Sequence, residues 1–266
     1  MLHAACARDA HASFREGGRV SSEIWSKADL HIHSSHSDGL ARIPEIMEYV
    51  EHQTDLSVIA ITDHNTIEGA LFAKSLEEMY GFEVIVGEEI SSKSGHIIGL
   101  FLHETIPAGL TAGETLSRIH DQDGIAIIPH PFSNRGVFGP MGRDSFSTAF
   151  NDIAFHALEV YNSMPFLVWA NAIAAKVFSG GQGIAATGGS DAHVLQGIGN
   201  GYTVFKGRTA EDLREGINRL ETHAAARKGG LGVALRYAFH FPRIRRQQSW
   251  NWERCKDGGP PSRREF

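Results

Sequence analysis

The feature that most constrains the fold is the alternation of short apolar runs with longer amphipathic segments. The apolar runs are short enough for strands: Ala28–His33, Leu56–Thr62, Phe82–Ile90, His96–Phe101, Ile125–Pro129, Leu158–Tyr161, Ile184–Thr187 and Thr203–Phe205. The segments with a helical pattern are Ile43–His52, Thr66–Tyr80, Ala112–Gln122, Phe166–Phe178 and Thr209–Arg219. Alternation of strands with helices of this length predicts α/β units around a parallel sheet, open or closed into a barrel.

The chain of 266 residues is expected to form one domain over residues 27–226, with an irregular segment on either side. Residues 1–26 lack a basic start followed by an apolar stretch, so we expect a loose extension rather than a secretory signal. The two cysteines, Cys6 and Cys255, lie in these outer segments and form no disulfide framework. A cytoplasmic location is therefore expected. No apolar run reaches the roughly 18 residues that a membrane span needs.

Charge is spread unevenly along the chain. The net charge is −6, but residues 227–266 carry ten Lys and Arg against three Asp and Glu, which leaves −13 for residues 1–226. An acidic body suits a cation-binding protein, although it also serves solubility. The basic tail interleaves arginine with tryptophan and could contact nucleic acid or an anionic membrane surface. The plainer interpretation is a partly helical, partly disordered extension that is dispensable for turnover of a small ester.

Histidines and carboxylates gather where the predicted strands end. The chain has 15 histidines, and several of them lie with acidic residues at or just beyond a strand end: His31, His33, Asp38, His64, Glu88, Glu89, His130, Asp191 and His193, with His96 at the beginning of its strand. The C-terminal edge of the strands is where α/β barrels assemble their active sites.

Taken singly, most of these residues have an ordinary explanation. His31 and His33 share one face of a strand and could chelate one ion, but two half-buried histidines would look the same. Asp38 beside Gly39 suits a turn, and Asp63 suits the cap of the following helix. An apolar strand with His, Asp or Glu at its end nevertheless recurs at least five times. This repetition favours a metal site.

The ordered motifs HxH, SDG, TDHN, GxE, a single His, PHP and GSDxH resemble those of the PHP (polymerase and histidinol phosphatase) superfamily. The resemblance extends over residues 27–220, and the segments 159–163 and 209–222 resemble the C-terminal portion of compact members. It implies a distorted (β/α)7 barrel with a site for two to three metal ions at the C-terminal ends of the strands. The positions that match the family's ligand pattern are His31, His33, Asp38, His64, Glu89, His96, His130, Asp191 and His193.

The resemblance also implies how the ligands are shared. The GxE spacing from Gly87 selects Glu89 over Glu88, and Glu89 is then expected to bridge two ions. Adjacent residues on a strand face opposite ways, so only one of the two glutamates can point into the site. The implied groups are His31, His33, Glu89 and Asp191 for one ion; Glu89, His96 and His130 for a second; and Asp38, His64 and His193 for a third.

The chain departs from the family pattern at two places. Asn65 stands where many members have a second aspartate, and we expect this to alter only an outer contact of the site. The gap between His96 and His130 is too short for the inserted helical domain of the branch that resembles the bacterial nucleoside-bisphosphate phosphatase. The substrate of that branch is therefore not transferred to this chain.

The ligand types indicate the chemistry. Nitrogen and oxygen ligands without thiolates suit Mn²⁺, Zn²⁺ or Fe²⁺. Clustered ions of this kind lower the pKa of a bound water to about 7, and so supply hydroxide for attack on a phosphate ester. No GxSxG or similar nucleophile motif is present. Arg135 and then Arg143 are the candidates to bind phosphate, although both could be solvated loop residues. Asp63 is expected to orient His64 or a bound water.

We therefore predict a metal-dependent phosphoesterase that cleaves a phosphomonoester or phosphodiester. A 3′-to-5′ exonuclease or nucleotide phosphodiesterase is the main alternative, and an amide or carbamate metallohydrolase or a non-catalytic binding module are further ones. The acidic body favours a small phosphorylated substrate over a long nucleic acid. A metal-bound water or a further histidine, such as His36 or His103, could protonate the leaving group, and the sequence does not choose among them.

Overall fold

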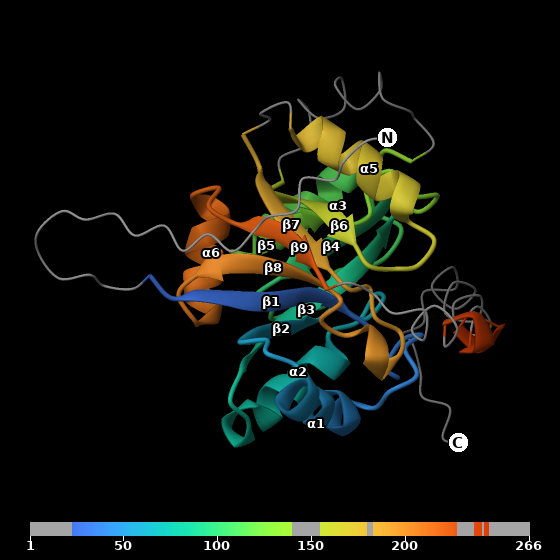
Figure 1. Ribbon diagram of the computed structural model, residues 1–266. Coiled ribbons are helices and arrows are strands. Elements are labelled where there is room, and N and C mark those ends of the chain that lie inside the picture. The colour runs from blue at the N-terminus through green and yellow to red at the C-terminus, as the bar shows by residue number, and fades with distance from the viewer. Residues whose placement is uncertain (1–22, 140–154, 180–182, 228–236, 241, 245–266) are drawn as a thin grey trace, which may run out of the picture.

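The computed structural model describes residues 23–139, 155–179, 183–227, 237–240 and 242–244. Figure 1 shows its elements, which in chain order are β1 (Trp25–Ile32), α1 (Ile43–Gln53), β2 (Val58–Ile61), α2 (Glu68–Leu76), the 3-10 turn η1 (Glu77–Met79), β3 (Glu83–Ser92), β4 (Gly95–Leu100), α3 (Ala112–His120), β5 (Ile125–Ile128), β6 (Ala157–Asn162), α5 (Val168–Phe178), β7 (Ala185–Gly189), the 3-10 turn η2 (Leu195–Gly197), β8 (Gly201–Lys206), α6 (Ala210–Asn218) and β9 (His223–Ala226). Every predicted helix and strand is present with modest shifts at its ends. Strand β9 was not predicted.

The strands form one mixed sheet in the order β7-β6-β5-β4-β3-β2-β1-β8-β9. Strands β1, β2 and β3 are parallel to one another, and so are β5, β6 and β7. The prediction of a parallel sheet is wrong for β4, which runs antiparallel to both β3 and β5, and for β8, which runs antiparallel to β1. Only Lys93 and Ser94 separate β3 from β4, and a parallel pair needs a crossover of a dozen or more residues.

The segment after β7 brings the sheet back onto β1 and nearly closes it. Ala192 pairs with Ile32 as a parallel bridge, with its N–H donating to the carbonyl of His31 at 3.3 Å and its carbonyl accepting from the N–H of His33 at 3.0 Å. Strands β1 to β7 thus follow one another around a distorted, nearly closed α/β barrel. This confirms the predicted fold class.

Alternating strand residues fill the inside and the outside of the barrel. In β2, Val58 and Ala60 belong to an inner apolar cluster, whereas Ile59 and Ile61 pack outward against α1 and α2. A third cluster lies between the strands and helices α3 and α5, on the opposite side of the barrel from α1 and α2 (Figure 1). Because the inside of the barrel is filled by apolar side chains, a cluster of histidines and carboxylates has room at an end of the barrel.

Helix α6 covers the end of the barrel where the parallel strands begin. Its Leu213 and Ile217 are fully buried in the inner cluster. The N–H of Ala210 donates to Glu83, the first residue of β3, at 2.7 Å. Thr209 caps the helix by accepting from the N–H of Asp212, which is worth about 1 kcal/mol. The other end, where the parallel strands finish, stays available for a site.

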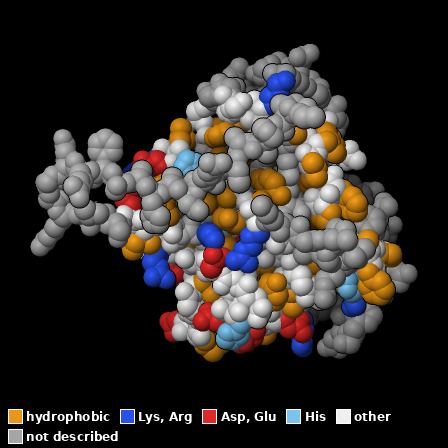
Figure 2. Space-filling model, viewed as in Figure 1, with side chains coloured by type: hydrophobic (Ala, Val, Ile, Leu, Met, Phe, Trp, Pro, Cys, Tyr) orange, Lys and Arg blue, Asp and Glu red, His pale blue; other side chains and the backbone are white. Residues whose placement is uncertain are grey.

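The outer surface mixes charges of both signs. Figure 2 shows basic and acidic side chains next to one another on one face, among hydrophobic ones. Exposed ion pairs such as Lys27–Asp55 and Lys206–Glu23 lie on or beside strands β1 and β8. Across the part of the chain that the structure describes, no helix has both the length and the apolar character to cross a membrane.

Candidate metal centre

The nine predicted ligands come together at the end of the barrel where the parallel strands finish. His31 is in β1 and Glu89 is in β3, while the others follow β1, β2, β5 or β7 or begin β4. Strand β4 runs antiparallel to its neighbours, so its first residues lie at the same edge as their last ones. This is why His96 joins the site from the start of a strand. All nine side chains are buried: His31, His33, Asp38, His64, Glu89, His96, His130, Asp191 and His193.

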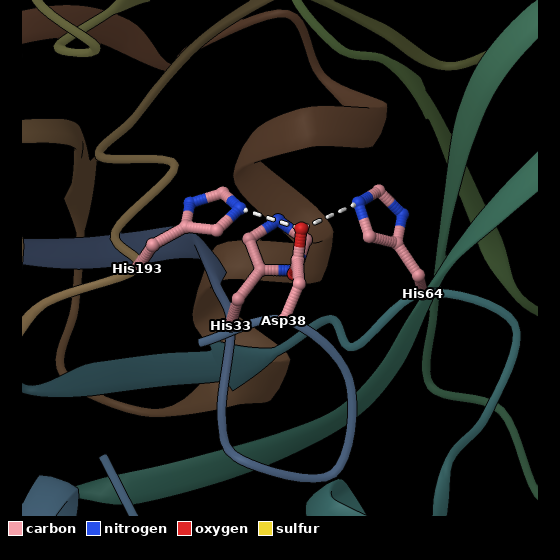
Figure 3. Close-up of side chains that lie close together, drawn as sticks. All are labelled: His33, Asp38, His64 and His193. Carbon is pink, nitrogen blue, oxygen red and sulfur yellow. Dashed lines mark hydrogen bonds and ion pairs between the residues drawn. The ribbon is translucent and has the colours of Figure 1, made fainter. Parts of the chain in front are cut away.

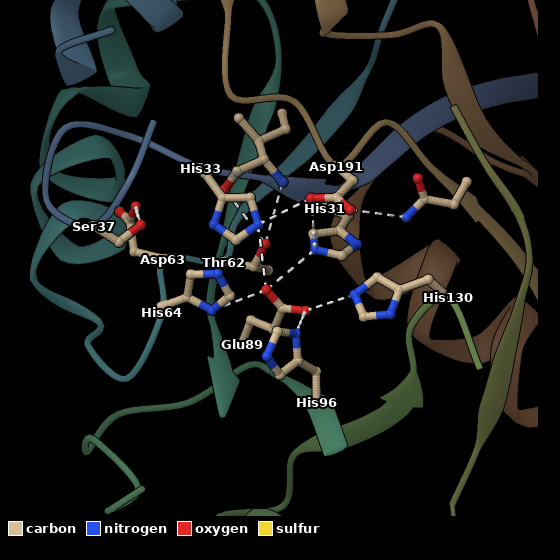
Figure 4. A network of polar contacts seen from close by, with 12 residues as sticks. His31, His33, Ser37, Thr62, Asp63, His64, Glu89, His96, His130 and Asp191 are labelled. Carbon is tan, nitrogen blue, oxygen red and sulfur yellow. Dashed lines mark hydrogen bonds and ion pairs between the residues drawn. The ribbon is translucent and has the colours of Figure 1, made fainter. Parts of the chain in front are cut away.

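Glu89 lies at the centre of the cluster (Figure 4). Its Oε1 is 2.8 Å from Nδ1 of His96 and 3.0 Å from Nε2 of His130. Its Oε2 lies near three further rings: His64 Nδ1 at 3.1 Å, His33 Nε2 at 3.3 Å and His31 Nε2 at 3.5 Å. One carboxylate has about four lone-pair positions, so it cannot satisfy five imidazoles through hydrogen bonds alone.

A second cluster forms around Asp38, which lies between the rings of His193 and His64 (Figure 3). Its Oδ2 is 3.0 Å from Nε2 of His193 and 3.5 Å from Nε2 of His64, and its Oδ1 is 3.5 Å from Nδ1 of His33. Burial by itself raises the pKa of Asp38, but the charges of His193 and His64 outweigh it and hold that pKa well below its usual range. The carboxylate is therefore ionised in this pocket.

Several ring nitrogens point into the cluster without a hydrogen-bond partner. Among the described residues, the buried Nε2 of His31, both ring nitrogens of His33 and Nδ1 of His64 make no hydrogen bond. Buried polar atoms are normally paired, and unpaired ones require an explanation such as an ion. Lone pairs on imidazole nitrogen, set among ionised carboxylates, are the donor set of Mn²⁺, Zn²⁺ and Fe²⁺ sites. The residues present therefore fit divalent metal ions.

The side chains form four overlapping groups in which the candidate donor atoms all lie within 4.8 Å of one another. The groups are His33, Asp38, His64 and His193; His31, His33 and Glu89; His31, His130 and Asp191; and His64, Glu89 and His96. The first contains the whole predicted third group, and the second contains most of the predicted first group. The other two combine residues that were predicted to hold different ions, so the clusters share ligands more than the predicted grouping implies.

Glu88 points away from the cluster, as expected for the neighbour of Glu89 on a strand. Its Oε2 accepts the N–H of Ile106 at 2.8 Å, and its Oε1 is buried without a partner among the described residues. Burial raises the pKa of Glu88 to about 8. The choice of Glu89 for the site agrees with this geometry.

Two polar residues of β6 hold members of the cluster and were not assigned from the sequence. Glu159 is buried, and its Oε1 lies 3.0 Å from Nδ1 of His31 while its Oε2 accepts the N–H of His130 at 2.7 Å. Asn162 donates from Nδ2 to Oε2 of Glu159 at 2.9 Å and to Oδ2 of Asp191 at 3.2 Å. The signal was available, because Glu159 is an acidic residue in an apolar strand, like the residues that were selected.

Asp63 holds a turn. Its Oδ1 accepts from the N–H of Ser34 at 2.7 Å and the hydroxyl of Ser37 at 2.6 Å, and its Oδ2 accepts from the hydroxyl of Ser34 at 2.6 Å. These bonds fix residues 34–37, which lead directly into Asp38. Asp63 was expected to orient His64 or a bound water, whereas the contacts of its carboxylate place it as a support for the turn before Asp38.

Of the six described residues other than glycine that have a positive φ, three lie in the cluster or directly beside it. Asn65, His130 and Asp191 have φ angles of 55°, 28° and 53°. Asn65 is held by its pairing with Ser91, whose N–H donates to its Oδ1 at 2.8 Å. Such conformations cost about 1–3 kcal/mol each and persist where surrounding contacts over-determine them, as at functional sites.

The remaining predicted residues lie in different places. Arg135 is exposed in the loop after His130, and its backbone carbonyl accepts the N–H of His96 at 2.9 Å. Arg143 lies outside the described residues. His36 is beside the site, in the turn supported by Asp63, and its Nδ1 is 3.9 Å from Glu68.

The proposal of His103 as the leaving-group acid is wrong. It follows the far end of β4, where its N–H donates to Gln122 at 3.0 Å, shortly before β5 begins. The six residues of β4 separate this end from His96, which is about 20 Å along an extended strand. Because β4 runs antiparallel to β3 and β5, the residues that follow it lie at the opposite end of the barrel from the cluster.

Comparison with family models agrees with this arrangement. A model described as the PHP domain matches residues 29–129, and one described as PHP-associated matches residues 169–222. The chain belongs to the PHP family. Its nine-residue cluster is therefore found in a fold family of metal-dependent phosphoesterases.

Relatives and solved structures support the family. An uncharacterized protein of Methanocaldococcus jannaschii is 46% identical over 52% of this PHP-family chain and 82% of its own length, and another from the same organism is 33% identical over 67% and 70%. The phosphoribosyl 1,2-cyclic phosphate 1,2-diphosphodiesterase of Eggerthella lenta is 35% identical over 35% of this chain and 37% of its own length. A two-domain protein from Bacteroides vulgatus, described as containing a predicted PHP-like metal-dependent phosphoesterase, shares the fold, with a TM-score of 0.62 at 19% identity over 81% of this chain and 69% of its own.

Proposed function

We propose that this protein hydrolyses a small phosphomonoester or phosphodiester at a centre of two to three divalent metal ions. One observation carries the proposal: the carboxylate of Glu89 lies within 3.5 Å of five buried imidazoles, several of whose nitrogens have no hydrogen-bond partner among the described residues. Buried carboxylates that are ionised need a positive partner. Divalent ions supply that charge and are the partners that this donor set prefers.

The nine side chains would hold the ions in overlapping groups, with Glu89 common to two of them. Bound in this way, the ions would lower the pKa of a water to about 7 and stabilise negative charge that develops on the phosphoryl oxygens. The protein contributes the fixed geometry. Glu159 holds His31 and Asn162 holds Asp191, so that the ligand atoms stay directed into the centre before substrate arrives.

Recognition of the phosphate is proposed for the loop that follows His130. Arg135 is exposed there, and its carbonyl bond to His96 ties the loop to the metal centre. A guanidinium can bind two phosphate oxygens at once, which suits it to this task. Arg143, eight residues further along the chain, remains a second candidate.

Two alternatives to a small-molecule phosphomonoesterase can be compared. A diesterase or an exonuclease differs from a monoesterase in what flanks the metals, and the similarity to the phosphodiesterase of Eggerthella lenta supports a diester as substrate. An amide or carbamate hydrolase is less well supported. Sites of that class bridge their metals with a carboxylated lysine, and none of the buried residues in the described chain is a lysine. We propose Glu89 for that position instead.

A substrate panel with metal analysis tests the proposal. Protein stripped of metal and reloaded with Mn²⁺ is expected to release p-nitrophenol or phosphate from monoesters, diesters, nucleotides or short oligonucleotides. His31→Ala and Asp191→Ala should abolish the activity, whereas His52→Ala, which removes an exposed histidine of α1, should not. Equal turnover by the metal-free and metal-loaded protein would contradict the proposal.

A further inference from the structure

A buried tyrosine from the C-terminal segment lies against the metal centre. Tyr237 is only 2% exposed although it belongs to the stretch that was predicted to be a loose tail. Its ring forms a small cluster with Val194 and Ile244, against which Leu40 and Met164 also pack. Val194 directly follows the proposed ligand His193. Part of the predicted tail is thus packed onto the rim of the site.

The hydroxyl of Tyr237 joins the backbones of two proposed ligands. Its Oη accepts the N–H of His193 at 3.1 Å and donates to the carbonyl of Asp191 at 3.3 Å. The same carbonyl lies 2.9 Å from Nδ1 of His193. A carbonyl can only accept, so Nδ1 of His193 carries a proton, and Nε2, 3.0 Å from Oδ2 of Asp38, is the ring nitrogen that a metal ion would take.

This contact falls where the backbone needs support. Asp191 has a φ of 53°, in the left-handed region that residues other than glycine adopt at a cost, so contacts that hold its backbone are favourable there. Asn162 holds its side chain, and Tyr237 holds its carbonyl. Gly197 lies so close that a Cβ added there would be 2.7 Å from Oη of Tyr237, so the absence of a side chain at this position leaves room for the hydroxyl.

We propose that Tyr237 is a positioning residue of the metal centre, which orients Asp191 and His193 and fixes the ring of His193 as a ligand through Nε2. This inference rests on the proposed function. It gives the C-terminal segment a role in the site, whereas the sequence suggested an extension that is dispensable for turnover. Loss of the hydroxyl should loosen the group of His33, Asp38, His64 and His193 in particular. Substitution of a residue that hydrogen-bonds to a metal ligand typically lowers metal affinity or activity by about 10- to 100-fold.

The test uses full-length Tyr237→Phe, which keeps the ring and removes only the hydroxyl. The Mn²⁺ affinity of the metal-stripped protein is measured by calorimetry, and the number of metal ions bound per chain by elemental analysis. Steady-state turnover of the best ester of the panel gives kcat and KM. We expect the weakest-bound ion to lose roughly 10- to 100-fold in affinity and kcat to fall with it, with little change in KM. Tyr80→Phe is the matched control, because its hydroxyl bonds to Glu48 on the surface.

A second variant separates positioning from packing. Ile244→Ala trims the same small cluster without touching the hydroxyl, so it should lower the melting temperature of the metal-free protein and leave Mn²⁺ affinity unchanged. Tyr237→Phe with wild-type affinity overturns the inference, whether or not its melting temperature falls. Wild-type protein that binds no divalent ion refutes the proposed function and this inference together. If the wild-type protein binds ions and hydrolyses the ester, and Tyr237→Phe has the same Mn²⁺ affinity and kcat, this inference alone is refuted.

Discussion

Glu159→Gln offers a direct test of how the site holds its histidines. The glutamate uses one oxygen for Nδ1 of His31, at 3.0 Å, and the other for two donors, the N–H of His130 and the amide of Asn162, at 2.7 and 2.9 Å. With both oxygens accepting, His31 carries its proton on Nδ1. Its Nε2, which is directed at Glu89 and Asp191, is then the ring nitrogen that a metal ion would take.

The glutamine cannot reproduce this pattern, because one of its two terminal atoms is a donor. Facing its oxygen toward His130 and Asn162 satisfies two donors, whereas facing it toward His31 satisfies one and leaves two donors opposed by an NH₂ group. One buried donor left unpaired costs about 1–3 kcal/mol, which favours the first orientation by roughly 5- to 140-fold. The NH₂ group then faces His31, moves the ring proton to Nε2 and removes that atom as a ligand.

We therefore expect Glu159→Gln to lower kcat and the affinity for Mn²⁺ by about 10- to 100-fold, with the fold retained. The assay is steady-state turnover of the best ester, with calorimetric titration of Mn²⁺ into metal-stripped protein. Glu83→Gln is the matched control, since that carboxylate also accepts a backbone N–H, from Ala210, but at the other end of the barrel. Wild-type kcat and affinity in Glu159→Gln would refute the argument that a carboxylate sets the proton position of His31.

Three more changes test separate parts of the site. Asp63→Ala removes three hydrogen bonds to the turn before Asp38, so urea denaturation should show a loss of about 3 kcal/mol and Mn²⁺ affinity should fall. Arg135→Ala should raise KM for an anionic ester several-fold without changing the bound metal measured by elemental analysis, and an unchanged KM would remove it from phosphate binding. A chain that ends at residue 227 should lose most of its kcat, because it lacks Tyr237, whereas a chain that ends at residue 245 should keep it; equal rates would return the tail to a dispensable role.

The predictions that succeeded depended on short-range patterns. The helices and strands were predicted within a few residues of their observed ends, because apolar spacing reports local geometry. The gathering of most of these histidines and carboxylates was also predicted, since the ends of parallel strands meet at one edge of a sheet, and the family resemblance added His96. The direction of β4 was not predicted, and the placement of His103 failed with it.

Two supporting residues show why the rest escaped the sequence. Glu159 was visible as an acid in an apolar strand, but its task depends on the distance to His31, which is 128 residues away in the chain. Tyr237 gave no signal at all, because nothing near it in sequence marks a tyrosine that reaches Asp191 and His193 from a segment with a basic, irregular composition.

By itself the sequence determined which elements form and which residue types gather, because hydrophobic periodicity and the chemistry of imidazole and carboxylate are local properties. The tertiary structure alone decided which atoms face one another. It set the direction of β4, the five imidazoles around Glu89, the proton position on His31 and the contact of Tyr237 with the site. Each of these follows from how distant segments pack, and packing is settled only when the whole barrel closes.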